Sequence, residues 1–253
     1  MRVLVTRPQP QADDWVARLR AQGIDALALP LLGIADLADP APLAARWLRL
    51  HGTDAPALLV FVSPNAVARF FAQRPPAARW PAGVLAAAPG PGTAAALQQQ
   101  GVAEAALVQP AADSAQFDAE ALWQQLRLRD WRGRSAWIVR GEGGRDTLAE
   151  WLRAAGADVH YVQAYRRGAP EWTDVERAHL AAALAAPAEH LWLLSSSEGV
   201  GHLRTLAPQA DWAAGAALAS HPRIAQAARA LGFGRVAEAA PHFDVQCRAI
   251  GRL

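Results

Sequence analysis

The segment VTRPQPQADDWVARLRAQG at residues 5–23 is the most informative part of this chain, because a similar segment, IVRGEGGRDTLAEWLRAAG, occurs again at residues 138–156. Each segment begins at the end of a strand-like stretch, places an arginine third, and ends in a helical stretch that a glycine stops. The two arginines, Arg7 and Arg140, are 133 positions apart, and so are the two terminal glycines. The spacing indicates that one structural unit occurs twice.

Two further stretches repeat in the same order. Residues 63–67, SPNAV, return as SSEGV at residues 196–200, again 133 positions later. Residues 91–101 return at residues 222–232, now 131 positions apart. A repeat this long is a duplicated half-protein and not a solenoid unit. We therefore expect two similar α/β lobes that face each other across a cleft.

The composition describes a globular protein with enough apolar residues for two cores. The chain has 253 residues, of which 52% are hydrophobic and 19% charged, which suits two domains of ordinary size. Its net charge is +2 and it has no dense basic run with interleaved aromatics, so nucleic acid is not an expected partner. Every fixed cation is arginine, whose planar fork suits carboxylates and phosphates.

The same sequence points to a cytoplasmic protein. Cys247 is the one cysteine, so no internal disulfide can form, as expected in a reducing compartment. The N-terminus leads directly into a strand-like stretch without the pattern of a signal peptide. No apolar stretch is long enough to span a bilayer, and we expect no contact with a membrane.

Strand and helix patterns alternate along the chain, which predicts parallel sheets covered by helices. Ser63 is expected to cap a helix that opens at Pro64, and Ser195 to form a capping box with Glu198. The residues leave open whether the first repeat pairs with the segment that follows it or with the C-terminal segment. We expect strands at 2–6, 24–29, 58–62, 84–88, 136–140, 159–165, 191–194 and 216–219, and connectors at 30–42 and 166–172.

The repeated motifs all fall at strand-to-helix turns, where ligands gather in parallel α/β sheets. Helix N-termini there present free N–H groups and the positive end of the helix dipole. Hydroxyls, backbone donors and a few arginines at these turns suit a ligand with several carboxylates. The candidate binding residues are Thr6, Arg7, Ser63, Asn65, Thr93, Arg140, Ser196, Ser197, His221 and Arg223.

Other kinds of site find less support. Gly90-x-Gly92-x-x-Ala95 is similar to a dinucleotide fingerprint, but its repeat at Ser220 has no glycine and no acidic residue follows at the required place. The histidines lack metal-ligand spacing, so no metal and no cofactor are expected. The serines at 195–197 lack the glycine-flanked nucleophile elbow. Tyr165, one of two tyrosines, ends a repeated strand where the chain is expected to cross between lobes.

The chain resembles the uroporphyrinogen-III synthase family over nearly its whole length. The order and spacing of several motifs carry the resemblance. One motif departs from the family pattern, because His221-Pro222-Arg223-Ile224 stands where many relatives have Gly-Pro-x-Thr, so the threonine is missing here. The motifs are Val5-Thr6-Arg7-Pro8, Phe61 to Val67, Gly90 to Thr93, Arg140 to Gly156, Tyr165-Arg166-Arg167, Ser196-Ser197, and Ser220 to Ala225.

The resemblance implies a fold of two flavodoxin-like, parallel-sheet α/β lobes joined by a two-stranded linker. It places residues 1–35 and 172–253 in a discontinuous first lobe, residues 40–165 in a second lobe, and linkers at 30–42 and 165–172. It also implies a monomeric lyase of tetrapyrrole (haem) biosynthesis. The implied substrate is hydroxymethylbilane, which is cyclised with loss of water and inversion of ring D.

The implied chemistry gives Tyr165 a role. Because the pyrrole nitrogen supplies electrons, loss of the substrate hydroxyl needs little more than a proton donor. Tyr165 is the candidate catalytic residue, which could donate to the departing hydroxyl or orient it. The rest of the task is to hold the two chain ends in one geometry, which can be worth ~7–11 kcal/mol. The alternative is a non-enzymatic, two-lobed protein that binds a small polycarboxylate.

Overall fold

A computed structural model describes residues 1–111, 114, 116–143 and 146–253. The chain divides into two compact units. Unit 1 comprises Met1–Ile34 and Arg167–Leu253, and unit 2 comprises Ala35–Arg166. Each unit is built on its own sheet, and the described residues form a sheet of five strands and a sheet of six.

In unit 1 the first strand of the chain lies in the interior of the sheet. The order is β11-β10-β9-β1-β2, and every pair is parallel. Strand β1 therefore contacts the C-terminal part of the chain through β9, which answers the question of pairing that the residues alone left open. The strands are β1 (Arg2–Val5), β2 (Ala26–Ala28), β9 (His190–Leu194), β10 (Ala216–Ala219) and β11 (Arg235–Glu238).

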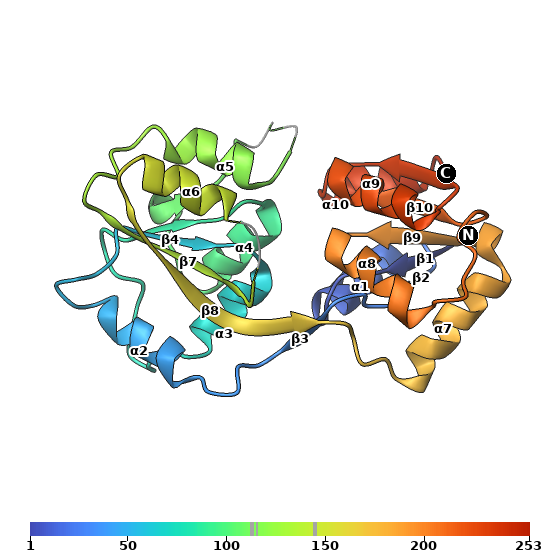
Figure 1. Ribbon diagram of the computed structural model, residues 1–253, viewed down its shortest axis with the longest axis horizontal. Coiled ribbons are helices and arrows are strands. Elements are labelled where there is room, and N and C mark those ends of the chain that lie inside the picture. Colours follow the sequence, from blue (N-terminus) through green and yellow to red (C-terminus); the bar gives the residue numbers. More distant parts are fainter. Residues whose placement is uncertain (112–113, 115, 144–145) are drawn as a thin grey trace. The chain divides into compact units, whose positions relative to one another are not determined.

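Helices cover both faces of this sheet because its strands are apolar on both sides (Figure 1). Leu4 and Trp192 pack with residues of α7, α8 and α9. Val3, Val5 and Leu193 point the opposite way and pack with residues of α1 and α10. The helices are α1 (Gln11–Ala21), α7 (Asp174–Ala185), α8 (Ser197–Leu206), α9 (Pro222–Leu231) and α10 (Phe243–Ile250), with a 3-10 turn at Pro187–Glu189.

Unit 2 repeats this architecture. Its sheet has the order β3-β8-β7-β4-β5-β6, and the pairs from β8 to β6 are parallel. The strands are β3 (Gly33–Ala35), β4 (Leu58–Phe61), β5 (Leu85–Ala87), β6 (Leu107–Val108), β7 (Ser135–Gly141) and β8 (Asp158–Gly168). The helices are α2 (Ala41–Arg49), α3 (Pro64–Phe71), α4 (Pro91–Gln99), α5 (Ala119–Leu126) and α6 (Thr147–Ala154), with a 3-10 turn at Glu104–Ala106.

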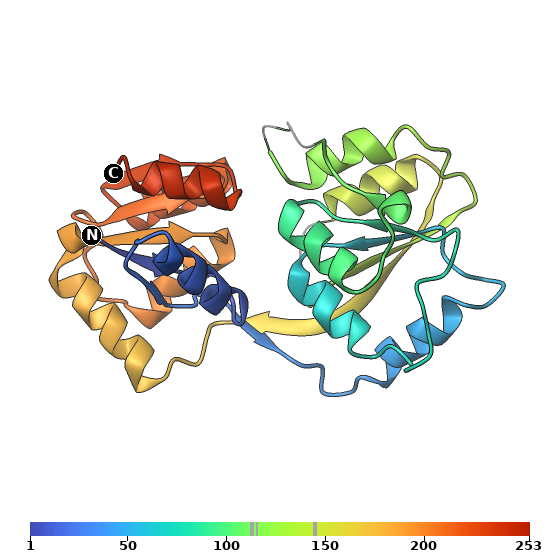
Figure 2. The same ribbon diagram turned by 180° about the vertical axis from the view of Figure 1, so that it is seen from behind.

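The two faces of this sheet carry different cores. Figure 1 shows α5 and α6 on one face, where their leucines pack against Leu58, Val60 and Ile138. Figure 2 shows α3 and α4 on the other face. That side holds an aromatic cluster in which the Phe61 and Phe70 ring centroids are 5.5 Å apart. The packing of both faces fixes the strand ends that carry the candidate site.

The predicted fold class of two α/β lobes with parallel sheets is confirmed, with two local corrections. The expected connectors contain a pair of neighbouring strands, since residues 33–35 form β3 and β8 continues to Gly168. The first connector ends where α2 begins at Ala41. The N-cap of α8 is Ser196 and not Ser195, since it is the Ser196 hydroxyl that accepts from the backbone N–H of Gly199. Because β8 continues to Gly168, Tyr165 lies within this strand and not at its end.

Both crossings between the units run through this pair of neighbouring strands. The boundary after Ile34 falls within β3, and the boundary after Arg166 falls within β8. Neighbouring strands hydrogen-bond each other's backbone, which a pair of separate loops would not do.

Among the described residues, no helix has the length and apolar character needed to cross a bilayer.

Candidate functional site

The carboxyl ends of β4, β5, β7 and β8 meet at one edge of the unit 2 sheet, because these strands are parallel neighbours. Ser63 follows β4, and Arg140 lies at the end of β7. Thr93 lies in the first turn of α4, the helix that follows β5. Tyr165 lies opposite Gly141 in β8. The edge thus gathers the hydroxyls and the cation that the sequence motifs predicted for this half of the chain.

Ser63 and Tyr165 form a hydrogen-bonded pair at this edge. Their hydroxyl oxygens are 3.1 Å apart, and either can donate. Ser63 also caps α3, since its Oγ accepts from the backbone N–H of Ala66 at 3.2 Å. The Tyr165 residue is 3% exposed, so its ring is held by packing. The pair joins a candidate proton donor to the N-terminus of a helix, the end at which negative charge is stabilised.

Asn65 and Thr93 lie in the first turns of α3 and α4. Both residues are buried, at 8% and 5% exposure. Pro64 opens α3 and Pro91 opens α4, and a proline at this position leaves no missing helical hydrogen bond. The two helix starts are therefore built alike, and their side chains pack into the unit more than they extend from it.

Arg140 is engaged by side chains that the sequence analysis did not single out. Its Nη1 donates to the Asp146 carboxylate at 2.8 Å, and Tyr161 donates to the same oxygen at 2.7 Å. The guanidinium carbon also lies 4.0 Å from the centroid of the Tyr161 ring. The hydrogen bonds from Tyr161 and then Arg140 hold the pKa of the Asp146 carboxyl below its usual range. Burial, and then the bond to Asp146, raises the pKa of Tyr161.

In unit 1, Thr6 and Arg7 follow β1 but differ in what they can offer a ligand. Thr6 is 3% exposed and its hydroxyl donates to the carbonyl oxygen of Leu193 at 2.8 Å, so this proton is already used between β1 and β9. Arg7 lies over the ring of Trp15, with 4.1 Å from the guanidinium carbon to the ring centroid. Its Nε is buried and has no hydrogen-bond partner among the described residues.

Burial makes the charged form of the Arg7 guanidinium less favourable than it is in water. Burial, with a smaller effect from Arg18, lowers the pKa of Arg7 to about 10. The Trp15 face offsets part of that cost, because a cation over an aromatic ring is attracted to it. A buried arginine N–H that lacks an acceptor has lost the hydrogen bond that it would make to water, which adds to this cost.

The remaining predicted residues form the N-termini of α8 and α9. Ser196 caps α8, and Ser197 is its first residue. His221 caps α9, with its Nδ1 accepting from the backbone N–H of Arg223 at 3.1 Å. In a neutral ring, this bond leaves the His221 proton on Nε2. Strands β9 and β10 are parallel neighbours, so both helix starts lie at the same edge of the unit 1 sheet as Thr6.

Three contributors at these edges were missed by the sequence analysis: Tyr161, Asp146 and Gly141. Tyr161 and Asp146 bind Arg140, and Gly141 lies against the Tyr165 ring. Their only signal in the sequence was closeness to Tyr165 and Arg140, because the contacts depend on how β7 and β8 pair. Among the described residues, no group of three or more histidine, cysteine or acidic side chains could hold a metal ion.

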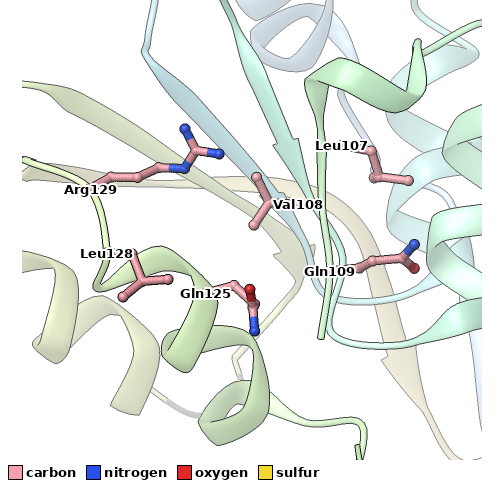
Figure 3. Close-up of a pocket in the computed structure, with 6 residues that line it drawn as sticks. All are labelled: Leu107, Val108, Gln109, Gln125, Leu128 and Arg129. Carbon is pink, nitrogen blue, oxygen red and sulfur yellow. The ribbon is translucent and has the colours of Figure 1, made fainter. Parts of the chain in front are cut away.

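A hollow of about 370 Å³ lies elsewhere in unit 2, between β6 and α5 (Figure 3). Its lining residues include none of those predicted from the sequence. Arg129 is the one charged side chain of the lining, and Leu128 is largely exposed. One cation beside two glutamines and three apolar side chains does not match a ligand that carries several carboxylates, so the strand edges remain the candidate site. The lining is Leu107, Val108, Gln109, Gln125, Leu128 and Arg129.

Comparison with known proteins gives one consistent family. The sequence model of the family described as Uroporphyrinogen-III synthase HemD matches residues 13–245. The uroporphyrinogen-III synthase of Salmonella typhimurium (strain LT2) is 35% identical over 179 residues, which cover 70% of each chain. That of Escherichia coli (strain K12) is 33% identical over 181 residues, again 70% of each chain.

Two solved structures are similar in fold. A mutant uroporphyrinogen III synthase from the extremely thermophilic bacterium Thermus thermophilus has a TM-score of 0.60 at 18% identity, covering 100% of this chain and 98% of the other. A uroporphyrinogen-III synthetase from Helicobacter pylori 26695 has a TM-score of 0.59 at 16% identity, covering 100% and 99%. At these identities the structures show the fold alone. The match over residues 13–245, together with the two bacterial relatives, shows that this chain belongs to the uroporphyrinogen-III synthase family.

Proposed function

We propose that this protein is a uroporphyrinogen-III synthase, a lyase of tetrapyrrole biosynthesis that cyclises hydroxymethylbilane with inversion of ring D and loss of water. Membership of the family supports the activity. The observation that carries the proposal within the molecule is the pair formed by Tyr165 and Ser63, 3.1 Å apart at the carboxyl edge of a parallel sheet. This is the edge where ligands bind in such folds.

Tyr165 is proposed as the proton donor in the first step. The bond between the substrate's methylene carbon and its hydroxyl oxygen breaks, the electrons of the pyrrole nitrogen fill the vacated position, and the Tyr165 proton leaves with the hydroxyl as water. Ser63 supports this step, because its hydroxyl can donate to the phenolic oxygen that has lost its proton. The N–H of Ala66, which donates to the same serine oxygen, polarises that hydroxyl further.

Carboxylate binding is proposed for the remaining predicted residues. Arg140 in unit 2 and Arg7 and Arg223 in unit 1 supply guanidinium groups, and the capped starts of α3, α8 and α9 supply backbone N–H groups. The substrate has eight carboxylates, so many modest contacts can fix its conformation. The side chains assigned to this role are the hydroxyls of Ser63, Thr93, Ser196 and Ser197, the amide of Asn65 and the imidazole of His221. The predicted Thr6 hydroxyl already donates to Leu193 and is not assigned to a carboxylate.

The catalytic contribution follows from that fixation. Unassisted, hydroxymethylbilane closes without inverting ring D, so the enzyme must hold the two ends in the arrangement that lets ring D be attacked at its substituted carbon. Positioning of this kind can lower a barrier by ~7–11 kcal/mol. We propose that the protein acts as a cytoplasmic monomer, without a cofactor or a metal.

The test is a product analysis. The purified protein is given hydroxymethylbilane without added nucleotide or metal, and the products are oxidised and separated by chromatography into porphyrin isomers. The proposal expects type III product. Type I product alone, at the rate of the unassisted reaction, would refute it and favour the non-enzymatic polycarboxylate binder. A requirement for added nucleotide would favour the reading of Gly90 and Gly92 as a dinucleotide fingerprint.

A further inference from the structure

Tyr165 owes its place to an irregularity in the pairing of β7 with β8. Arg140 pairs with Gln163, but the next residue of β7, Gly141, pairs with Tyr165, so β8 advances by two residues where β7 advances by one. Paired residues of neighbouring strands share a face, and successive residues of a strand alternate between faces. The extra residue of β8 therefore turns Tyr165 to the face opposite that of Gln163, as a β-bulge does.

The space beside Gly141 is filled by the Tyr165 ring. A Cβ atom placed on Gly141 would lie 2.6 Å from Cε2, 2.9 Å from Cζ and 3.0 Å from Cδ2 of that ring. Contacts this short do not occur between such atoms, so either the ring or the strand would have to move. Gly141 has no positive φ, and its backbone conformation is open to any residue. A glycine is needed at this position because the Tyr165 ring leaves no room for a side chain, and not because the backbone conformation demands one.

Backbone hydrogen bonds hold the strands in this register. The Glu142 N–H donates to the Tyr165 carbonyl oxygen at 3.0 Å, and the Val62 N–H donates to the Val139 carbonyl oxygen at 3.2 Å. The first bond anchors β8 at Tyr165, and the second ties the segment that leads to Ser63 onto β7. The ring cannot retreat from an added methyl group at Gly141 without moving its hydroxyl relative to Ser63.

We propose that Gly141 is a positioning residue for Tyr165: the missing side chain lets the ring lie flat against β7 and brings its hydroxyl to Ser63. The inference rests on the proposed function, in which that hydroxyl donates the proton. Gly141→Ala is therefore expected to lower kcat by about the same factor as Tyr165→Phe, with KM changed less than twofold. The combined variant is expected to be no slower than Tyr165→Phe alone, because Gly141 acts through the tyrosine.

Two outcomes of the kinetic test would overturn the proposal. One is a Gly141→Ala enzyme with kcat within twofold of the unmodified enzyme. The other is a combined variant whose loss equals the product of the two single losses, which would mean independent roles. Gly201→Ala is the matched control, because nothing lies within 4 Å of the added methyl group.

A spectroscopic test does not depend on activity. The chain has only two tyrosines, so selective ¹³C labelling of the ring carbon bonded to oxygen gives two resonances, and Tyr165→Phe identifies one of them. Gly141→Ala is expected to shift the Tyr165 resonance and leave that of Tyr161 in place. An unmoved Tyr165 resonance in Gly141→Ala would overturn the inference. If the unmodified protein instead fails to form type III product, the proposed function is refuted, but the spectroscopic test of the contact between Gly141 and Tyr165 still applies.

If the Gly141→Ala protein does not fold, a second pair of variants still tests the proposal. Removing the ring by Tyr165→Ala should make room for the methyl group, so the variant carrying both alanines is expected to unfold within a few degrees of Tyr165→Ala alone. If the doubly substituted protein fails to fold while Tyr165→Ala folds, the glycine is needed by the backbone itself and the proposal is wrong.

Discussion

The phenolic oxygen of Tyr165 and the hydroxyl oxygen of Ser63 lie 3.1 Å apart, although 102 positions separate the two residues in the chain. Ser63 owes its place to β4 and the cap of α3, and Tyr165 owes its place to the shifted register of β8. The serine therefore has two tasks, and substitutions at this position separate them. Its oxygen caps the N-terminus of α3 and is also hydrogen-bonded to Tyr165, the proposed proton donor.

Ser63→Ala is expected to impair both tasks, and Ser63→Thr to retain them. Loss of an N-cap costs about 1 kcal/mol of unfolding free energy, and loss of the bond to Tyr165 is expected to lower kcat. Threonine can cap the helix and keep a hydroxyl near Tyr165. Urea unfolding and turnover, measured on both variants, check this. Equal turnover in the alanine and unmodified proteins would remove Ser63 from the mechanism.

Tyr165→Phe is expected to slow turnover by about 10- to 100-fold without abolishing it. A positioned acid contributes on the order of 10²-fold or more, but water and the positioning of substrate remain in the variant. Stability should fall little, because the ring that packs on β7 is kept. Steady-state rates of type III product measure the effect. Full activity of the phenylalanine variant would exclude Tyr165 as the donor.

Arg7→Met is expected to make the protein more stable and a weaker binder. Burial lowers the pKa of Arg7 to about 10, which corresponds to a free-energy cost on the order of 3 kcal/mol for the charged form. Methionine keeps an unbranched chain over Trp15 without the charge. The free energy of unfolding is expected to rise by about 1–3 kcal/mol near pH 8, and KM for the anionic substrate is expected to rise with it.

The stabilising effect of Arg7→Met should depend on pH in one direction. Above about pH 10 the folded arginine gives up its proton while the unfolded one keeps it, so the folded protein loses its charge penalty as pH increases. The difference in urea unfolding between the two proteins is therefore expected to be constant below pH 9 and to narrow above pH 10. A difference that widened there would contradict the assigned cause.

Two glycines of α8 are expected to respond to alanine in opposite ways. A Cβ on Gly199 would lie 3.0 Å from the Cβ of Leu31, so Gly199→Ala overpacks this contact and is expected to destabilise unit 1 by about 1–3 kcal/mol. Gly201 has open space around it, and its alanine variant should gain about 0.5–1 kcal/mol from helix propensity. Thermal or urea unfolding of the two variants compares their stabilities. Equal changes in the free energy of unfolding would contradict the close contact between residue 199 and Leu31.

The duplicated architecture and the chemistry of the turns could be predicted from the sequence. The hydrophobic runs before Thr6, Ser63 and Ser195 can be recognised as strands that lead into helices, because strand burial and the pattern of a helix start are local properties. The Ser63 cap follows from Ser-Pro alone and is confirmed. The Ser195 cap was wrong, because three successive serines at 195–197 offer the same local chemistry and only the packed helix selects Ser196.

Which of these groups come into contact could not be predicted from the sequence, because the contacts depend on how the strands pair. Tyr165 reaches Ser63 through the register shift opposite Gly141, and Arg140 turns to Asp146 and Tyr161, because these distances depend on how β7 pairs with its neighbours. The partner of β1 was likewise decided by the assembled sheet, where β1 lies between β2 and β9. Pairing between strands that are distant in the chain is set by the joint burial of many side chains, which no single stretch of sequence contains.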